Sequence, residues 1–431
     1  MTRGETSASL TAKRSRALES VASSAFMIGR PTVSVMSMLI GRGAEISGDL
    51  NRLLVTALRC WRADTAPTTR WQVMESLGEV RDATGDPRYI AALALTDPVL
   101  QRGVVTGLIS RFTVEEIIDG DTLRLLGMAA HAIGDMPGSL NLLSRAESVL
   151  HEQGKLGVLS QMLTTQVIDS LGPGQWNRAA AAAREGGWLA AATHQPVWPA
   201  GMQACAAMDC ALRGDVRQAI AHAAEVEFLA GGQPLNGLLS RAQLARGVAL
   251  VTTGQHAAAY AELRRLFDPA DPSFHPRERF GGIMFLADAA AEAGRREDAR
   301  RVLRGLEAAG AEPASPMLRV HLRYARAILA DPLTAPASYA AMLSADYASW
   351  TWERARAELA YGSWLWRERS ASEALVPLRS AETAFGRMGA VNWAAKAHRE
   401  SGRAIARELA AAGTAVVCCS QPTQAGTAGP T

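Results

Sequence analysis

The residues of this chain that could do chemistry fall into three small groups, and the first is a pair of cysteines. Cys205 and Cys210 lie five residues apart on one predicted helix. That spacing points the two thiols to different faces of the helix, which is unfavourable for binding one metal ion together. We therefore interpret them as small buried thiols.

The second group lies in the loop FDPADPSFHP, residues 267–276. Its side chains Asp268, Asp271 and His275 could hold a cation. Asp-Pro pairs, however, are first of all turn and cap formers. We interpret the loop as structural and predict no metal site.

The third group is aromatic, in a chain with only 6% Phe, Trp and Tyr. Tryptophan is enriched at binding hot spots, so tryptophans around one turn could line a groove. They could equally fill wide gaps between helices, which is the interpretation we favour. A second tryptophan-rich region, residues 350–393, is open to the same two interpretations. The candidate groove residues are Trp176, Trp188, His194, Trp198, Met202 and Asp209.

Motifs of the common enzyme classes are absent from the sequence. No Walker-type phosphate loop can be written, because the Gly154-Lys155 pair lacks the preceding glycine. There is no zinc-protease histidine pair, no Gly-x-Ser-x-Gly nucleophile elbow and no dinucleotide fingerprint. We predict no catalytic residue and no cofactor. An enzyme on this scaffold stays a third hypothesis, and it would need Asp209 and His222 to converge with the tryptophans.

Composition bounds the remaining possibilities. The 431 residues carry 45 Lys and Arg against 42 Asp and Glu, and 48% are hydrophobic, which is typical of a soluble globular protein. Basic and acidic residues are interspersed, so we expect no nucleic-acid face. The five cysteines form no disulfide pattern and no apolar run is long enough to span a membrane, so we expect a cytoplasmic protein.

The elements that carry these residues repeat along the chain with a period of 40 residues. Five glycines mark that period, and a small residue follows each one after five positions. A glycine can end one helix in a left-handed turn, and the small residue lets the next helix approach closely. The glycines are Gly134, Gly174, Gly214, Gly254 and Gly294, followed by Ser139, Ala179, Ala219, Ala259 and Ala299.

Prolines recur about 20 residues after the glycines, at Pro196, Pro234, Pro276 and Pro316. Proline in the first turn of a helix is a start signal. We therefore predict an all-α fold, a TPR-like α-solenoid of antiparallel helix pairs, over residues 21–410. Residues 1–20 and 411–431 are predicted to be disordered. A superhelix of this kind has a concave surface suited to a peptide, a small effector or another protein.

Several stretches of this array have a distinctive sequence, and residues 354–397 are the most specific, with a Tyr-Gly-x-Trp-Leu helix and a Phe-x-x-x-Gly-Ala turn. The other stretches are RLLGMAAHAIGD (124–135), HEQGKLGVLSQ (151–161), QLARGVAL (243–250), FDPADPSFHP (267–276), AGRREDAR (293–300) and RYARAILADP (323–332). Together they resemble the helical-repeat region of large ATP-binding LuxR-type transcriptional regulators of actinobacteria. The resemblance covers roughly residues 50–405.

The resemblance implies a sensor module that would relay an inducer or partner signal to transcription. Members of that family also carry a nucleotide-binding domain and a helix-turn-helix, and neither motif is present here, so ATP hydrolysis and direct DNA binding are not carried over. The expected partner is a small-molecule or peptide effector, or a protein, and a homo-oligomer is possible. The alternative hypothesis is a protein-interaction scaffold with no link to transcription.

Overall fold

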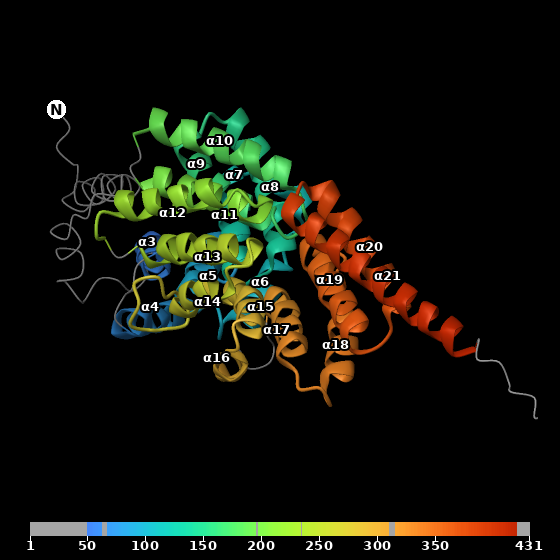
Figure 1. Cartoon of the computed structure of the whole chain (residues 1–431). Coiled ribbons are helices and arrows are strands. Elements are labelled where there is room, and N and C mark those ends of the chain that lie inside the picture. The colour runs from blue at the N-terminus through green and yellow to red at the C-terminus, as the bar shows by residue number, and fades with distance from the viewer. Residues whose placement is uncertain (1–49, 63–66, 195–196, 234, 310–314, 420–431) are drawn as a thin grey trace, which may run out of the picture.

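The computed structural model describes residues 50–62, 67–194, 197–233, 235–309 and 315–419. Within them the chain forms 19 α-helices and three short 3-10 helices, and no strand. The predicted all-α fold is confirmed (Figure 1). None of these helices is both long and apolar enough to cross a membrane, among the residues described.

The helices follow one another as antiparallel pairs, each with a helix A and a helix B, and α21 follows the last pair. The 3-10 helices η1 (Arg81–Ala83), η2 (Val114–Glu116) and η3 (Glu278–Gly282) lie in the connections. The pairs are α3 (Leu50–Arg62) with α4 (Pro67–Glu79), α5 (Pro87–Thr96) with α6 (Arg102–Ile109), α7 (Gly120–Ala132) with α8 (Met136–Glu152), α9 (Leu156–Asp169) with α10 (Trp176–Ala192), α11 (Val197–Arg213) with α12 (Val216–Ala230), α13 (Asn236–Thr252) with α14 (His256–Arg265), α15 (Ile283–Glu292) with α16 (Arg296–Ala309), α17 (Pro316–Leu329) with α18 (Ala335–Leu343), and α19 (Thr351–Glu368) with α20 (Ala371–Met388), before α21 (Val391–Cys419).

The five predicted glycine turns are confirmed. Each glycine is left-handed, with φ between 70° and 93°. After each one, the next residue's N–H donates to the carbonyl five residues back, as Asp135 does to Ala130 at 2.9 Å and Asp215 to Cys210 at 2.8 Å. This is the Schellman arrangement, which satisfies the last carbonyls of helix A. The small residue five positions later is buried in all five pairs.

The proline signal holds at one position and fails at another. Pro316 begins α17, and Ser315 before it caps the helix by accepting from the N–H of Leu318. Pro276 begins no α-helix, because residues 266–282 form a series of turns and α15 starts only at Ile283. Within those turns the Asp271 carboxylate accepts from the backbone of Ser273, which favours a turn over a helix. Pro196 and Pro234 lie outside the described residues.

Successive turns of the superhelix contact each other through the glycine turns. The Gly172 carbonyl, in the α9–α10 turn, accepts from the N–H of Trp352 in α19 at 3.0 Å. The Gly214 carbonyl accepts from the Asn392 side chain in α21 at 3.3 Å, across 178 residues. Each contact joins one helix pair to an element five pairs further on. The array therefore coils tightly, and side chains of the second turn cover part of the inner surface of the first.

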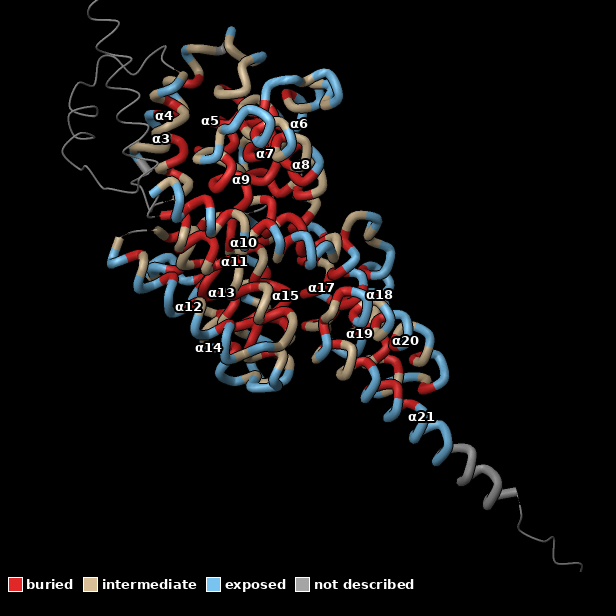
Figure 2. The backbone as a smooth tube through the Cα atoms, turned by 90° about the horizontal axis from the view of Figure 1, so that it is seen from above, coloured by how far each residue is buried: buried red, intermediate tan, exposed pale blue. Residues whose placement is uncertain are grey.

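Near the C-terminus the helices of the repeat change length. Helix α18 has nine residues, whereas α19 and α20 have 18 each. Helix α21 continues to Cys419, beyond the predicted end of the array at residue 410, because the alanine-rich sequence there favours helix. It projects from the body of the molecule (Figures 1 and 2). The predicted N-terminal disorder, residues 1–20, and residues 420–431 lie outside the described residues.

Candidate functional site

A cluster of buried ionisable side chains lies inside the first superhelical turn, on the A helices α7, α9 and α13 and at the start of η3. We call it the first-turn cluster: His131, Asp169, Arg241, Arg277 and Glu278. His131 Nδ1 lies 2.8 Å from Asp169 Oδ1, and His131 Nε2 lies 3.2 Å from Arg241 Nη2. Because a carboxylate only accepts and a guanidinium only donates, His131 donates to Asp169 through Nδ1 and accepts from Arg241 at Nε2.

Arg241 connects this histidine to the second carboxylate of the first-turn cluster. Its Nη2 also donates to Glu278 Oε1 at 2.9 Å, and Arg277 donates through its own Nη2 to the His131 carbonyl at 2.9 Å. Two arginines thus balance two carboxylates, which is what allows four charges to remain buried. Residues from α7, α9, α13 and η3 are held together at one point.

Burial and charge act against each other in this cluster. Burial alone would raise the pKa of Glu278, but the guanidiniums of Arg241 and Arg277 hold that pKa well below its ordinary value. Burial would lower the pKa of Arg241, and Glu278 raises it instead. The nearby Cys205 has no such compensation, and burial raises its pKa to about 12. Glu278 and Arg241 are therefore ionised at neutral pH, whereas Cys205 is an inert thiol.

His275 fastens the loop before η3 to helix α3. Its Nε2 donates to the Trp61 carbonyl at 2.7 Å, and its Nδ1 accepts from the N–H groups of Arg277 and Glu278. The Trp61 ring packs edge-on against His275, with ring centroids 4.9 Å apart. Burial lowers the pKa of His275 to about 4, so the imidazole is neutral in the folded chain at neutral pH.

A small pocket opens beside the first-turn cluster, with a volume of about 60 Å³. A water molecule occupies about 30 Å³ in the liquid, so the pocket accepts a group of only a few heavy atoms. The charged residues in its wall are Arg62, Arg241 and Glu278. The remaining lining residues are Leu58, Trp61, Met128, Gln161, Thr164, Thr165, Val197, Trp198, Leu235, Gly237 and Leu238.

Donors in and around this wall lack partners within the described part of the chain. Trp198 Nε1 and Arg241 Nε are buried and donate to nothing, and the Gln161 side chain makes no hydrogen bond. Arg62 lies over the Trp198 ring, 4.5 Å from its centroid. Burial lowers the pKa of Arg62 to about 10, which leaves it cationic at neutral pH. Buried polar groups are normally satisfied. Unpartnered buried donors also occur elsewhere among the described residues, and those in this wall lie where an acceptor could enter.

Of the six candidate groove residues, Trp198 lines this pocket, and Met202 packs on the same helix, α11, against Gly186. Trp176 lies elsewhere: it is buried against Trp352, with ring centroids 5.1 Å apart. It fills the space between the two superhelical turns, which is the gap-filling role we favoured.

The other three candidates lie on the outer parts of the pairs. The side chain of Trp188 is 66% exposed. His194 is exposed and has a left-handed backbone with φ of 52°, just after the end of α10. Asp209 pairs with Arg213 on its own helix at 2.9 Å. The structure thus does not gather the six residues into one groove, and their binding role stays a prediction.

The enzyme hypothesis required Asp209 and His222 to converge with the tryptophans. Asp209 forms an ion pair with Arg213, and His222 lies 2.6 Å from the side chain of Gln203.

In the loop 267–276, Asp268 and Asp271 accept from nearby backbone N–H groups, which supports the structural interpretation.

One trio of possible metal ligands exists among the described residues: Glu147, His151 and Glu185. The Glu147 carboxylate already accepts from Gln166 at 2.6 Å and pairs with Arg178 at 3.3 Å. An adjacent guanidinium disfavours a second cation, so we interpret this trio as a surface ion-pair network.

Sequence reasoning missed the first-turn cluster. Its signal in the sequence is an ionisable residue in an otherwise apolar or small-residue helix, such as Asp169 in MLTTQVIDSL and Arg241 in LLSRAQLARG. Taken one at a time, such residues only interrupt the apolar pattern of a helix and do not indicate a cluster. Their partners come from helices 37 to 110 residues away, which periodicity does not reveal.

A second buried ionic cluster lies on the A helices of the next three pairs after η3, and we call it the second-turn cluster: Asp288 of α15, Tyr324 of α17 and Arg356 of α19. Tyr324 donates to Asp288 Oδ1 at 2.8 Å, and Arg356 pairs with Asp288 Oδ2. Aromatic rings surround the guanidinium, with the Trp393 and Phe285 centroids 4.4 and 4.5 Å from its central carbon. Arg356 is 1% exposed.

Comparisons with known proteins identify the fold. Over 84% of this chain and 99% of the other, the chain is similar to a structure described as "Crystal Structure of Rap Protein Complexed with Competence and Sporulation Factor", at 11% identity and a TM-score of 0.50. The apo form of RapI gives 12% identity and a TM-score of 0.40, over 83% of this chain and 96% of that one. The chain shares the fold of TPR-like helical repeats. No family model and no curated protein matches it.

Proposed function

We propose that this chain is a regulatory sensing module that binds a short peptide or a small polar effector at the first-turn pocket. The observation that carries the proposal is the set of unpartnered donors beside the pocket, Gln161, Trp198 and Arg241. An acceptor group that reached them would satisfy buried donors whose desolvation costs about 1–3 kcal/mol each. A carbonyl or carboxylate is the matching chemistry, because Arg62 adds a positive charge.

The size of the pocket supports an anchoring role. About 60 Å³ holds one amide or carboxylate group but not a whole peptide. The remainder of the effector would lie on the rim near Trp61 and Leu235. The Rap structure with a similar fold is complexed with Competence and Sporulation Factor, so a fold of this kind can hold a bound factor.

The output we propose is a change in how the two superhelical turns contact each other. The pocket lies next to η3, and η3 belongs to the loop that His275 fastens to α3. An effector at the pocket would alter this contact, and a partner protein would sense it. The resemblance to the repeat region of LuxR-type regulators supports transcription as the process regulated. This link stays a proposal.

The experiment is a thermal-shift screen of the full chain against short peptides, sugars and lipidic precursors. A specific ligand at a hundredfold its dissociation constant should stabilise the chain by about 2.7 kcal/mol. Gly237→Leu should abolish the shift, because Gly237 lines the pocket and a leucine side chain there would take up its space. The variant should still fold, because a Cβ at this position meets only ordinary contacts, the nearest at 3.7 Å. Gly305→Leu, at an exposed helical glycine, is the matched control and should keep it.

A protein-interaction scaffold is the second candidate, and exposed apolar side chains on the B helices favour it. Trp188 on α10 is 66% exposed and Phe228 on α12 is 77% exposed. Large apolar side chains in such positions are common at protein interfaces. If no class of small ligand shifts the melting temperature and a protein partner is captured through these residues, the scaffold function replaces the sensing function.

A further inference from the structure

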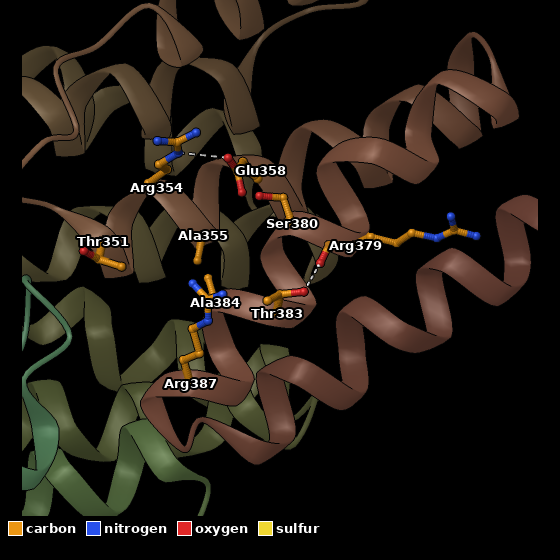
Figure 3. Close-up of a pocket in the computed structure, with 9 residues that line it drawn as sticks. All are labelled: Thr351, Arg354, Ala355, Glu358, Arg379, Ser380, Thr383, Ala384 and Arg387. Carbon is orange, nitrogen blue, oxygen red and sulfur yellow. Dashed lines mark hydrogen bonds and ion pairs between the residues drawn. The ribbon is translucent and has the colours of Figure 1, made fainter.

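A second hollow, the α19–α20 groove, lies between helices α19 and α20, far along the chain from the first-turn pocket. Its volume is about 450 Å³, and Figure 3 shows the residues that line it. From α19 come Thr351, Arg354, Ala355 and Glu358. From α20 come Arg379, Ser380, Thr383, Ala384 and Arg387.

The groove exists because helix α18 is short. Along this array each helix B packs against the following helix A. Helix α18 has nine residues, against 17 in α8 and in α10. At 1.5 Å per residue the missing length is about 12 Å, or roughly two turns.

The aromatic contacts of α18 show which part of α19 it covers. Tyr339 stacks on Trp364, with ring centroids 4.8 Å apart, and it also contacts Tyr361. Both partners lie in the C-terminal half of α19, whereas the groove residues of α19 lie between 351 and 358. The groove is therefore the place that the last two turns of a full-length helix B would fill.

The walls of this place carry an excess of positive charge. Arg354 pairs with Glu358 at 3.0 Å, and Glu358 is the only carboxylate in the lining. Arg387 has no ion pair within the described part of the chain. Figure 3 shows its guanidinium turned toward Ala384 and Ala355, whereas the Arg379 side chain points away from them. The Arg387 guanidinium thus faces a floor of small residues, while that of Arg354 lies at the edge of the groove beside Glu358. A floor of small residues permits a helix to approach closely.

We propose that the α19–α20 groove binds an acidic helical segment of a protein partner, about two turns long. Such a segment would take the vacant place of helix B and pair its carboxylates with Arg354 and Arg387. The two terminal segments of this chain are not acidic, so they do not match such a ligand. Residues 1–49 carry more basic than acidic side chains, and residues 420–431 carry no charged side chain. The groove is a different site from the first-turn pocket, and the two share no lining residue.

The test is fluorescence anisotropy with the full chain and a dye-labelled 12-residue helical peptide of alanine and leucine with glutamates along one face. We expect saturable binding that weakens as salt rises. Arg354→Glu with Arg387→Glu should weaken it at least tenfold. Arg184→Glu with Arg217→Glu, at exposed arginines without ion pairs on α10 and α12, is the matched control and should change it less than twofold.

Two further variants separate charge from shape. Glu358→Gln removes the only acidic group of the lining and should tighten binding several-fold. Thr383→Trp fills the groove without changing charge, at an exposed position, and should abolish binding. Circular dichroism and the melting temperature establish that each variant is folded.

The proposal is overturned if a lysine version of the peptide binds equally well, or if the groove variants bind like the control pair. Equal, groove-dependent binding of a single-stranded oligonucleotide of the same charge would assign the groove to a nucleic acid instead. Self-association that the double variant abolishes, without peptide binding, would assign it to a second copy. Gly237→Leu should leave groove binding intact, so failure here and failure of the sensing function are distinguishable.

Discussion

The two buried ionic clusters lie in different parts of the array, one on α7, α9, α13 and η3 and the other on α15, α17 and α19, and their surroundings differ. In the second-turn cluster, Arg356 is enclosed by four aromatic rings and is 1% exposed. In the first-turn cluster, Arg241 and Glu278 reach the wall of a pocket. Buried donors without a partner occur in both clusters among the described residues, at Arg241 Nε in the first and at Arg356 Nε and Nη1 in the second, so the pocket is what distinguishes the two.

This difference separates a structural use of buried charge from a binding use. The four rings cover the Arg356 guanidinium and exclude water from it, so the second-turn cluster fixes how α15, α17 and α19 pack. A pocket wall with unsatisfied donors has a place for another molecule's acceptor. The same type of residue, buried arginine on helix A, thus has two roles that depend on its neighbours.

The largest effect is expected from Arg356→Met. Removing the guanidinium leaves Asp288 buried without its ion-pair partner, and breaking a buried pair costs about 3–5 kcal/mol. Urea unfolding should show that loss in the free energy of unfolding. Arg326→Met, at an exposed pair with Glu307, should cost less than about 1 kcal/mol. If both variants lose the same amount, the second-turn cluster is not the structural element described here.

The pH dependence of stability tests the contact between α3 and the loop before η3. The pKa of His275 is about 4 in the folded chain and 6.5 in the unfolded chain, so the unfolded state binds the extra proton. Above pH 6.5 the residue contributes no pH dependence. Stability should fall by about 3 kcal/mol between pH 6.5 and pH 4 from this residue alone.

Urea unfolding of the chain and of His275→Gln across that range measures the contribution, since the glutamine does not titrate. We expect the difference between the two curves to change with pH below 6.5 and to be flat above it. A difference that is flat throughout would mean that His275 titrates normally and is not held by Trp61.

Two of the glycines that end A helices allow a matched test of how closely successive superhelical turns pack. Gly214 and Gly294 are both left-handed, so alanine strains the backbone at each by about 1–2 kcal/mol. At Gly214 the added Cβ would also lie 2.1 Å from Asn392 of α21, whereas nothing lies within 4 Å at Gly294. Gly214→Ala should therefore lose about 1–3 kcal/mol more in the free energy of unfolding. Equal losses would show that the turns do not pack this closely in solution.

The smallest effect is expected at the pocket itself. Gly237→Leu replaces a helical glycine and meets only ordinary contacts, so its free energy of unfolding should change by less than about 1 kcal/mol. A large loss would mean that the pocket is packed closed rather than open to a ligand. Thermal unfolding of Gly237→Leu beside Gly305→Leu measures this.

The pairing of helices could be predicted from the sequence because its determinants are local. Glycine at 134, 174, 214, 254 and 294 and the small residue five positions later act within one turn, and both were found where expected. The predicted helix start at Pro276 was wrong for a local reason too, because the aspartates before it stabilise turns.

The contact between superhelical turns could not be predicted. It depends on residues 178 positions apart, such as Asn392 and Gly214, and on a coil pitch that results from small rotations accumulated over five pairs. The first-turn cluster has the same origin, because Arg241 meets His131 only through that coiling. Of the predicted groove residues, Trp198 reaches the pocket, while Trp176 packs between the turns.

The central claim is that an effector binds beside the first-turn cluster and not beside the second-turn cluster. Hydrogen–deuterium exchange of the full chain, with and without the strongest ligand from the thermal-shift screen, tests it most directly. We predict added protection in α3, in α11 around Trp198 and at the start of α13, with no change around Arg356 in α19. Protection confined to α15, α17 and α19, with none around the pocket, would contradict the account.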